Sequence, residues 1–159
     1  MSRTTGGAPG NGLLDETSKA IIAELQQDGR RSYSAIGRAV GLSEAAVRQR
    51  VQRLLDSGVV QIVAVTDPMQ LGFARQAMIG IRADGDLEPI ATELGQIPEI
   101  DYVTITAGSF DLLVEVVCES DDQLLELVSG KIRAIDGVRS TESFVYLKLV
   151  KQTYSWGVR

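Results

Sequence analysis

The chain has 159 residues and a net charge of −5, with 16 Lys/Arg, 21 Asp/Glu, a single cysteine and no histidine. Its length suits one domain or two small ones. Without histidine the chain cannot build a Ser-His-Asp triad, a Cys-His pair or a His-ligated metal site, and one cysteine rules out an intrachain disulfide framework. We therefore expect a protein of a reducing cytoplasm that is not an enzyme and needs no metal or cofactor.

The N-terminal part of the chain is basic, although the whole chain is acidic. Residues 1–12 have no apolar core and predict a flexible tail rather than a signal peptide, and no run approaches the roughly 18 apolar residues of a membrane span. The first 66 residues hold eight Lys/Arg and six Asp/Glu, whereas the rest of the chain holds eight and fifteen. The segment from Arg30 to Arg53 contains six arginines and only one acidic residue, Glu44. This stretch can attract nucleic acid, and we expect no membrane partner.

Three helices are expected over residues 13–60. The first covers 16–27, the second covers 33–40, and the third follows Gly41-Leu42 and runs over Ser43–Ser57. Apolar residues recur in the third helix at helical spacing, at Val47, Val51, Leu54 and Leu55. The third helix alone could be an ordinary amphipathic helix with a solvated basic face. The short helix and glycine corner before it favour a helix-turn-helix unit.

The outer face of the third helix has the residue types that a helix in the DNA major groove needs. Small residues at its start allow close approach, glutamine can pair with base edges, and arginine can bind phosphates. The candidate DNA-binding residues are Ser43, Ala45, Arg48, Gln49, Arg50, Gln52 and Arg53. The predicted partner is double-stranded DNA.

A β-branched run follows the third helix. Residues 59–66 (VVQIVAVT) predict a strand that forms a small wing or a tether. Asp67-Pro68 breaks the run, and we assign residues 61–73 to a strand tether and linker. The first domain is thus predicted to be a winged helix-turn-helix.

The second predicted domain covers residues 74–151 and alternates strands with helices, before a C-terminal tail at 152–159. The expected elements are a strand at 74–82, a helix at 87–94, strands at 100–106 and 110–118, a helix at 120–135 and a strand at 138–150. This β-α-β-β-α-β order predicts a ferredoxin-like fold with four antiparallel strands and both helices on one face. The whole chain is then of the α+β class.

Alternation along the strands assigns side chains to two sheet faces. The face under the helices is predicted to hold Ile79, Ile81, Val103, Ile105, Leu112, Val114, Val116, Val145, Leu147 and Leu149. The opposite face is predicted to hold Met78, Tyr102, Leu113, Val117, Phe144 and Tyr146, among Thr104 and Glu115. An exposed face should be more polar than this, so a homodimer that buries it is favoured over a sheet with scattered apolar residues.

A helix-turn-helix unit, a tether and a ferredoxin-like domain in this order resemble the Lrp/AsnC family of prokaryotic transcription regulators, also called feast/famine regulatory proteins. The stretches that are similar are LDETSKAIIAELQQDGR, GLSEAAVRQRVQRLLDSGVV and TAGSFDLLVEV, the last with a Gly-x-x-Asp turn at Gly108–Asp111. The resemblance implies dimers that assemble further, commonly into octamers. It also implies that amino acids bind near this turn, at contacts between dimers.

Carried onto this sequence, the resemblance makes Gly108, Ser109 and Asp111 candidates for effector binding. Four weaker candidates are Thr104, Thr106, Thr141 and Ser143. Turn N–H groups could hold an amino acid's carboxylate, and Asp111 could pair with its ammonium. The alternative is that Gly108 and Ser109 only make a tight turn, which Asp111 caps. Where the family turn often has Asp-Tyr, this chain has Ser109-Phe110.

The leading functional hypothesis is a sequence-specific DNA-binding transcription regulator that responds to a small effector, which the resemblance implies is an amino acid. A second hypothesis is an architectural DNA-binding protein that ignores metabolites. A third is a metabolite-binding or enzymatic ferredoxin-like protein with a borrowed helical unit; the lack of histidine and of a clustered acid-base pair counts against an enzyme.

Overall fold

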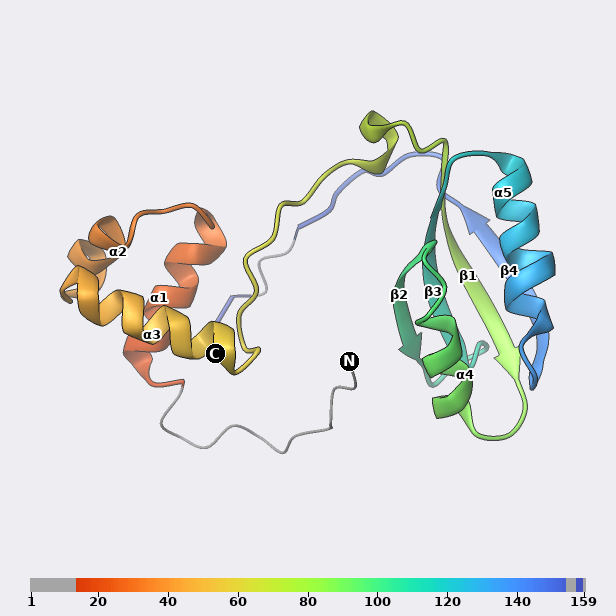
Figure 1. Cartoon of the computed structure of the whole chain (residues 1–159), viewed down its shortest axis with the longest axis horizontal. Helices are drawn as coiled ribbons and strands as arrows, with labels where there is room; N and C mark the ends of the chain where they lie inside the picture. Colours follow the sequence, from red (N-terminus) through yellow and green to blue (C-terminus); the bar gives the residue numbers. More distant parts are fainter. Residues whose placement is uncertain (1–13, 154–156, 159) are drawn as a thin grey trace. The chain divides into compact units, whose positions relative to one another are not determined.

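Figure 1 shows the computed structural model of the chain, which describes residues 14–153 and 157–158. Residues up to 64 belong to one compact unit and residues 65–150 to another, and each is treated by itself. The predicted tail at 1–12 lies outside the described residues, as do Tyr154 and Trp156. No helix in the described ranges is long and apolar enough to cross a membrane.

The first unit contains the three predicted helices, α1 (Glu16–Gln27), α2 (Tyr33–Val40) and α3 (Glu44–Asp56). Each helix begins after a residue whose side chain accepts a backbone N–H of the first turn, which satisfies a donor that the helix itself cannot pair. These N-caps are Asp15, Ser32 and Ser43. The helices pack around a small apolar core of Ile21, Leu25, Ile36, Val47 and Val51. All three predicted helices are therefore confirmed.

The corner between α2 and α3 depends on two glycines. Gly41 ends α2 at a φ of 73°, a left-handed conformation that favours glycine. Gly37 accepts the N–H of Leu42 at 2.9 Å through its carbonyl. A Cβ at Gly37 would lie 2.5 Å from the carbonyl oxygen of Leu42. The corner can close this tightly only because residue 37 has no side chain.

The strand predicted at residues 59–66 is wrong for this chain. After Val59 the backbone has no regular secondary structure up to the 3-10 helix η1 (Pro68–Leu71), and the apolar side chains of the run are exposed, with Val63 at 69%. A strand is stable only when its N–H and C=O groups pair with a neighbour. No strand in the described part of the chain pairs with this run, so no wing forms within these residues, and the alternative of a tether stays a prediction.

The second unit has the predicted β-α-β-β-α-β order. Its elements are β1 (Arg75–Ala83), α4 (Leu87–Leu94), β2 (Ile100–Ile105), β3 (Leu112–Cys118), α5 (Asp121–Glu126) and β4 (Val138–Val145). The strands form one antiparallel sheet in the order β2-β3-β1-β4, as a ferredoxin-like fold requires. The helix predicted at 120–135 is confirmed only in part, because α5 continues as a π-helix over Leu127–Lys131 and a 3-10 turn over Ile132–Ala134.

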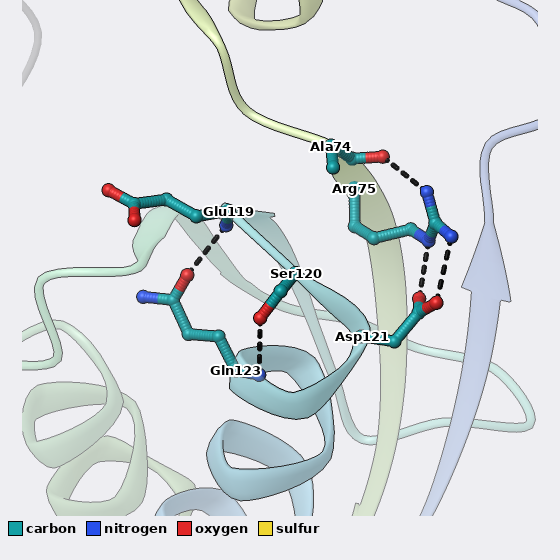
Figure 2. Close-up of polar contacts among 6 residues, drawn as sticks. All are labelled: Ala74, Arg75, Glu119, Ser120, Asp121 and Gln123. Atoms are coloured by element: carbon teal, nitrogen blue, oxygen red, sulfur yellow. Dashed lines mark hydrogen bonds and ion pairs between the residues drawn. The ribbon is translucent and has the colours of Figure 1, made fainter.

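The start of α5 is fixed by three pairs of polar contacts that Figure 2 shows. The Arg75 guanidinium, at the start of β1, donates to both carboxylate oxygens of Asp121, and Nη2 lies 2.8 Å from Oδ2. Ser120 caps the helix by accepting the N–H of Gln123, whose own side chain accepts the N–H of Glu119 at 2.6 Å. These contacts fix the start of α5 beside the first strand.

The predicted core face is confirmed at its centre and wrong at its edges. Buried strand residues pack with Ile90 and Leu94 of α4 and with Leu127 and Ile132 of the segment after α5, so the helical segments cover one face. The central predicted residues, Ile79, Ile81, Leu112, Val114 and Val116, are fully buried, and Val103 packs against them. The predicted residues that are exposed are Ile105, Val145, Leu147 and Leu149.

The reason for these exceptions is the position of the edge strands. β2 and β4 lie at the two edges of the sheet, where side chains have neighbours on one side only. β4 also ends at Val145 rather than at residue 150, so Leu147 lies beyond the sheet and is 97% exposed.

Candidate nucleic-acid interface and effector turn

The outer face of α3 contains three exposed residues with uncommitted side chains. Ala45, Gln49 and Arg53 lie on the side opposite to the buried Val47, Val51 and Leu54. Within the part of the chain that the structure describes, the side chains of Gln49 and Arg53 form no hydrogen bond or ion pair. Ser43, at the start of the helix, uses its hydroxyl to accept the N–H of Ala46. This face can therefore meet a ligand without losing contacts of its own.

Two further predicted residues of this face are held by weak contacts within the first unit. Arg48 pairs with Glu44 at 2.8 Å and lies 5.2 Å above the ring of Tyr33, while Gln52 donates to Asp56 at 2.8 Å. Exposed pairs one helical turn apart contribute only a few tenths of a kcal/mol. DNA could therefore displace them at little cost.

Arg50 is engaged inside the unit. Its Nη1 donates to both oxygens of Asp15, at 2.9 and 2.7 Å, and to the hydroxyl of Ser18 at 3.1 Å. The backbone N–H of Ser18 and then the hydrogen bond from Arg50 lower the pKa of Asp15 to about 2. The structure thus assigns Arg50 to holding α3 against the start of α1. Helix periodicity placed this residue on the flank of the face and could not reveal a partner 35 residues earlier.

The Gly-x-x-Asp turn is closed by hydrogen bonds at both of its ends. Thr106 donates through its backbone N–H to the carbonyl of Asp111 at 2.9 Å and through its hydroxyl to the carbonyl of Phe110 at 2.6 Å. Asp111 donates through its N–H to the carbonyl of Ile81, and its Oδ2 accepts the N–H of Ala83 at 2.9 Å. Asp111 therefore ties the turn to the end of β1, and its part in effector binding stays a prediction.

Gly108 is not required for the shape of the turn. Its φ is not in the positive range, and a Cβ built on it would meet nothing within 4 Å. Tight turns often need glycine for its backbone freedom, but this one does not. Gly108 and Ser109 are both exposed, so the tip of the turn is open to a ligand or to another subunit.

A single chain does not bring the predicted effector residues into one site. Thr106, Gly108, Ser109 and Asp111 share the turn. Thr104 pairs with Leu113 and so belongs to the uncovered face of β2. Thr141 and Ser143 pair with Ile81 and Ile79 and so belong to the helix-covered side of β4, at the opposite edge of the sheet. With strands about 4.8 Å apart, roughly 14 Å separates the two edges.

The uncovered sheet face has an aromatic cluster close to the turn. The ring of Phe110 lies over Gly80, where a Cβ would come within 2.7 Å of it. Phe110 also meets Phe144 edge to face, with ring centroids 5.9 Å apart, and the guanidinium of Arg82 lies 4.4 Å from the Phe110 centroid. Sequence reasoning missed Phe110 and Arg82 as site residues; the only signal was a glycine inside a strand, which often marks close approach.

The rest of this face mixes apolar and polar groups. Tyr102 and Phe144 are 52% and 43% exposed, and Gln76 donates to Glu115 at 2.9 Å. Burial and then the charge of Glu115 raise the pKa of Tyr146 to about 12.

A cavity of about 390 Å³ lies elsewhere in the second unit. Its lining residues are Thr66, Pro68, Leu71, Phe73, Pro98, Glu99, Asp101, Val117 and Gln123. None of the predicted effector residues belongs to it.

Both units match known family models. Residues 14–55 match the AsnC-type helix-turn-helix domain, and residues 73–159 match a model described as the PF0864 C-terminal dimeric alpha+beta barrel domain. An uncharacterized HTH-type transcriptional regulator of Pyrococcus abyssi is 35% identical to this chain over 144 residues, which cover 89% of this chain and 91% of the relative.

Two solved structures have similar folds. The leucine response regulatory protein LrpA of Mycobacterium tuberculosis has a TM-score of 0.78 at 30% identity, covering 87% of this chain and 96% of that one. The complex of the transcriptional regulator NMB0573 of Neisseria meningitidis with L-Met also has a TM-score of 0.78, at 26% identity, covering 89% of this chain and 95% of that one.

A helix-turn-helix unit with a free basic face, followed by an α+β domain, defines the class of DNA-binding transcriptional regulators, not a class of enzymes. Within this class, the chain belongs to the Lrp/AsnC family.

Proposed function

We propose that this regulator binds specific DNA sequences as a dimer and that an amino acid modulates its assembly and its DNA affinity. The observation that supports DNA binding most directly is the uncommitted outer face of α3. In this proposal Gln49 reads a base edge and Arg53 contacts a phosphate. Because its proposed partner is DNA, the proposed location of this regulator is the cytoplasm.

Gel-shift titrations at several salt concentrations test the DNA face. Gln49→Ala should cost about 1–3 kcal/mol on the preferred sequence and less on others. Arg53→Ala should weaken binding to every sequence and reduce the salt slope by about 1. Arg133→Ala is the matched control, because Arg133 is exposed in the second unit and has no ion-pair partner in the described chain. If both α3 variants bound like this control, α3 would not be the DNA-binding helix.

The uncovered sheet face is the proposed dimer interface. Its apolar side chains, among them Leu113, Phe144 and Tyr102, would lose their contact with water against a second copy. Leu113→Glu would place an unpaired carboxylate in that interface and should give monomers by light scattering. A parent protein that stays monomeric at micromolar concentration would contradict the proposal.

The amino-acid response is proposed at the tip of the 106–111 turn. The open surface at Gly108 and Ser109 supports it, and so does the Neisseria relative solved with L-Met. Since the candidate residues of one chain are dispersed, a complete site would combine turns or strands of several subunits, in keeping with assembly beyond the dimer, up to an octamer.

A thermal-shift screen with the free amino acids tests this response, since a ligand of the native state raises the melting temperature. A ligand found in this way should also change DNA affinity, and DNA should change its affinity in return. Binding of DNA that no amino acid changes would favour an architectural role.

A further inference from the structure

We propose that Arg82 binds the carboxylate of the amino-acid effector at the 106–111 turn. This inference rests on the amino-acid response proposed above. It adds to the turn a residue outside its Gly-x-x-Asp sequence.

Arg82 lies between the two residues of β1 whose backbone Asp111 contacts. Asp111 donates its backbone N–H to the carbonyl of residue 81 and accepts the N–H of residue 83 with Oδ2, at 2.9 Å in both cases. Asp111 is therefore hydrogen-bonded to the residues on both sides of Arg82. A cationic side chain and an anionic side chain thus come from adjoining positions at the end of the sheet.

Arg82 is held in place without an ion pair to any residue in the described ranges. Its guanidinium lies 4.4 Å from the centroid of the Phe110 ring, and Phe110 is itself fixed over Gly80 and against Phe144. Stacking on an aromatic ring leaves the N–H edge of a guanidinium free to donate. By contrast, Arg75 and Arg139 of the same unit are paired with Asp121 and Asp84.

The charges of Arg82 and Asp111 are opposite to those of the carboxylate and the ammonium of an amino acid. Arg82 and Asp111 form no ion pair with each other, although Asp111 is hydrogen-bonded to the backbone of both residues that flank Arg82. Oδ2 of Asp111 accepts the N–H of Ala83. An amino acid brings an ammonium and a carboxylate two bonds apart. It could pair its ammonium with Oδ1 of Asp111 and its carboxylate with the fork of Arg82.

The test compares an amino acid with its carboxamide by calorimetric titration. The probe is the amino acid that gives the largest thermal shift with the parent, together with its amide. The parent should bind the acid more tightly than the amide. Arg82→Gln should lose roughly 10- to 150-fold in affinity for the acid, as expected for one charge-assisted contact, and should no longer distinguish the two ligands. Arg133→Gln is the matched control and should bind like the parent.

The outcomes separate the two proposals. If no amino acid binds the parent, the proposed amino-acid response is wrong and this inference falls with it. If the parent binds one and Arg82→Gln binds it equally well, only the role of Arg82 is wrong. Light scattering on the parent and on Arg82→Gln tests a third outcome. If the variant loses affinity and also dissociates into monomers, Arg82 is an interface residue and the inference is overturned.

Discussion

Replacing Gly37 by alanine should destabilise the helix-turn-helix corner, although the same change stabilises most helices. In a helix interior, Gly→Ala gains about 1 kcal/mol because alanine loses less backbone freedom on folding. At residue 37 the new Cβ would lie 2.5 Å from the carbonyl oxygen of Leu42, where ordinary contacts begin near 3.4 Å. The oxygen belongs to the backbone and cannot move without opening the corner.

The balance of these two effects gives the magnitude. Overpacking costs about 1–3 kcal/mol, and an overlap with fixed backbone belongs at the upper end. After subtraction of the helix gain of about 1 kcal/mol, we expect a net loss of about 2 kcal/mol, or roughly a 30-fold rise in the opening equilibrium of the corner. DNA binding should weaken with it, because the corner orients α3.

Hydrogen exchange of the full chain, read on peptides from α2 and α3, measures that opening directly. The matched control is Gly130→Ala, since Gly130 lies in the π-helix after α5 and its Cβ would meet only Glu126 Cγ at 3.8 Å. That variant should exchange more slowly or at an unchanged rate near residue 130. Slower exchange in α2 and α3 of the Gly37 variant would show that the overlap does not govern stability there.

Three other changes give distinct outcomes. Arg50→Gln should raise the pKa of Asp15 only part of the way from about 2, because the backbone N–H at the helix start remains; carboxyl NMR titration measures this pKa. The stabilisation of the fold by the ionised Asp15 is complete above about pH 4 and is lost as the pH falls toward 2, which acid unfolding measures. Glu115→Gln should lower the pKa of Tyr146 from about 12 without restoring an ordinary value, since burial is the larger cause; phenolate absorbance reports it. Gly108→Ala should melt at or above the parent's temperature, because its backbone and surroundings admit a side chain.

The helices of the first unit could be predicted because their signals are local. A serine or aspartate before an apolar repeat specifies both the start and the buried side of a helix, and Ser43 shows the pattern fully. The interaction of Arg50 with Asp15 could not be predicted, since it depends on how α1 and α3 pack. Periodicity gives a residue's direction around its own helix and nothing about a partner 35 residues away.

The errors in the strand predictions have a common cause. A run of apolar residues predicts a strand equally well at the centre of a sheet, at its edge or beyond it. Residues 59–66 and Leu147 have suitable residue types but no neighbouring strand among the residues that the structure describes. Strand formation is a property of pairs, so a single sequence read in order overestimates it wherever no partner strand follows.

Asp111 shows why a turn sequence cannot separate a structural role from a binding role. The carboxylate has two oxygens, and in this chain one of them, Oδ2, holds the N–H of Ala83. Capping uses only part of the group, so it is compatible with an ammonium at Oδ1. The capping role determines which variant is informative. Asp111→Ala would remove the hydrogen bond to Ala83 together with any ligand contact. Asp111→Asn keeps an acceptor for the N–H of Ala83 and removes only the charge. Loss of amino-acid affinity in the asparagine variant, with an unchanged melting temperature, would therefore isolate the binding role.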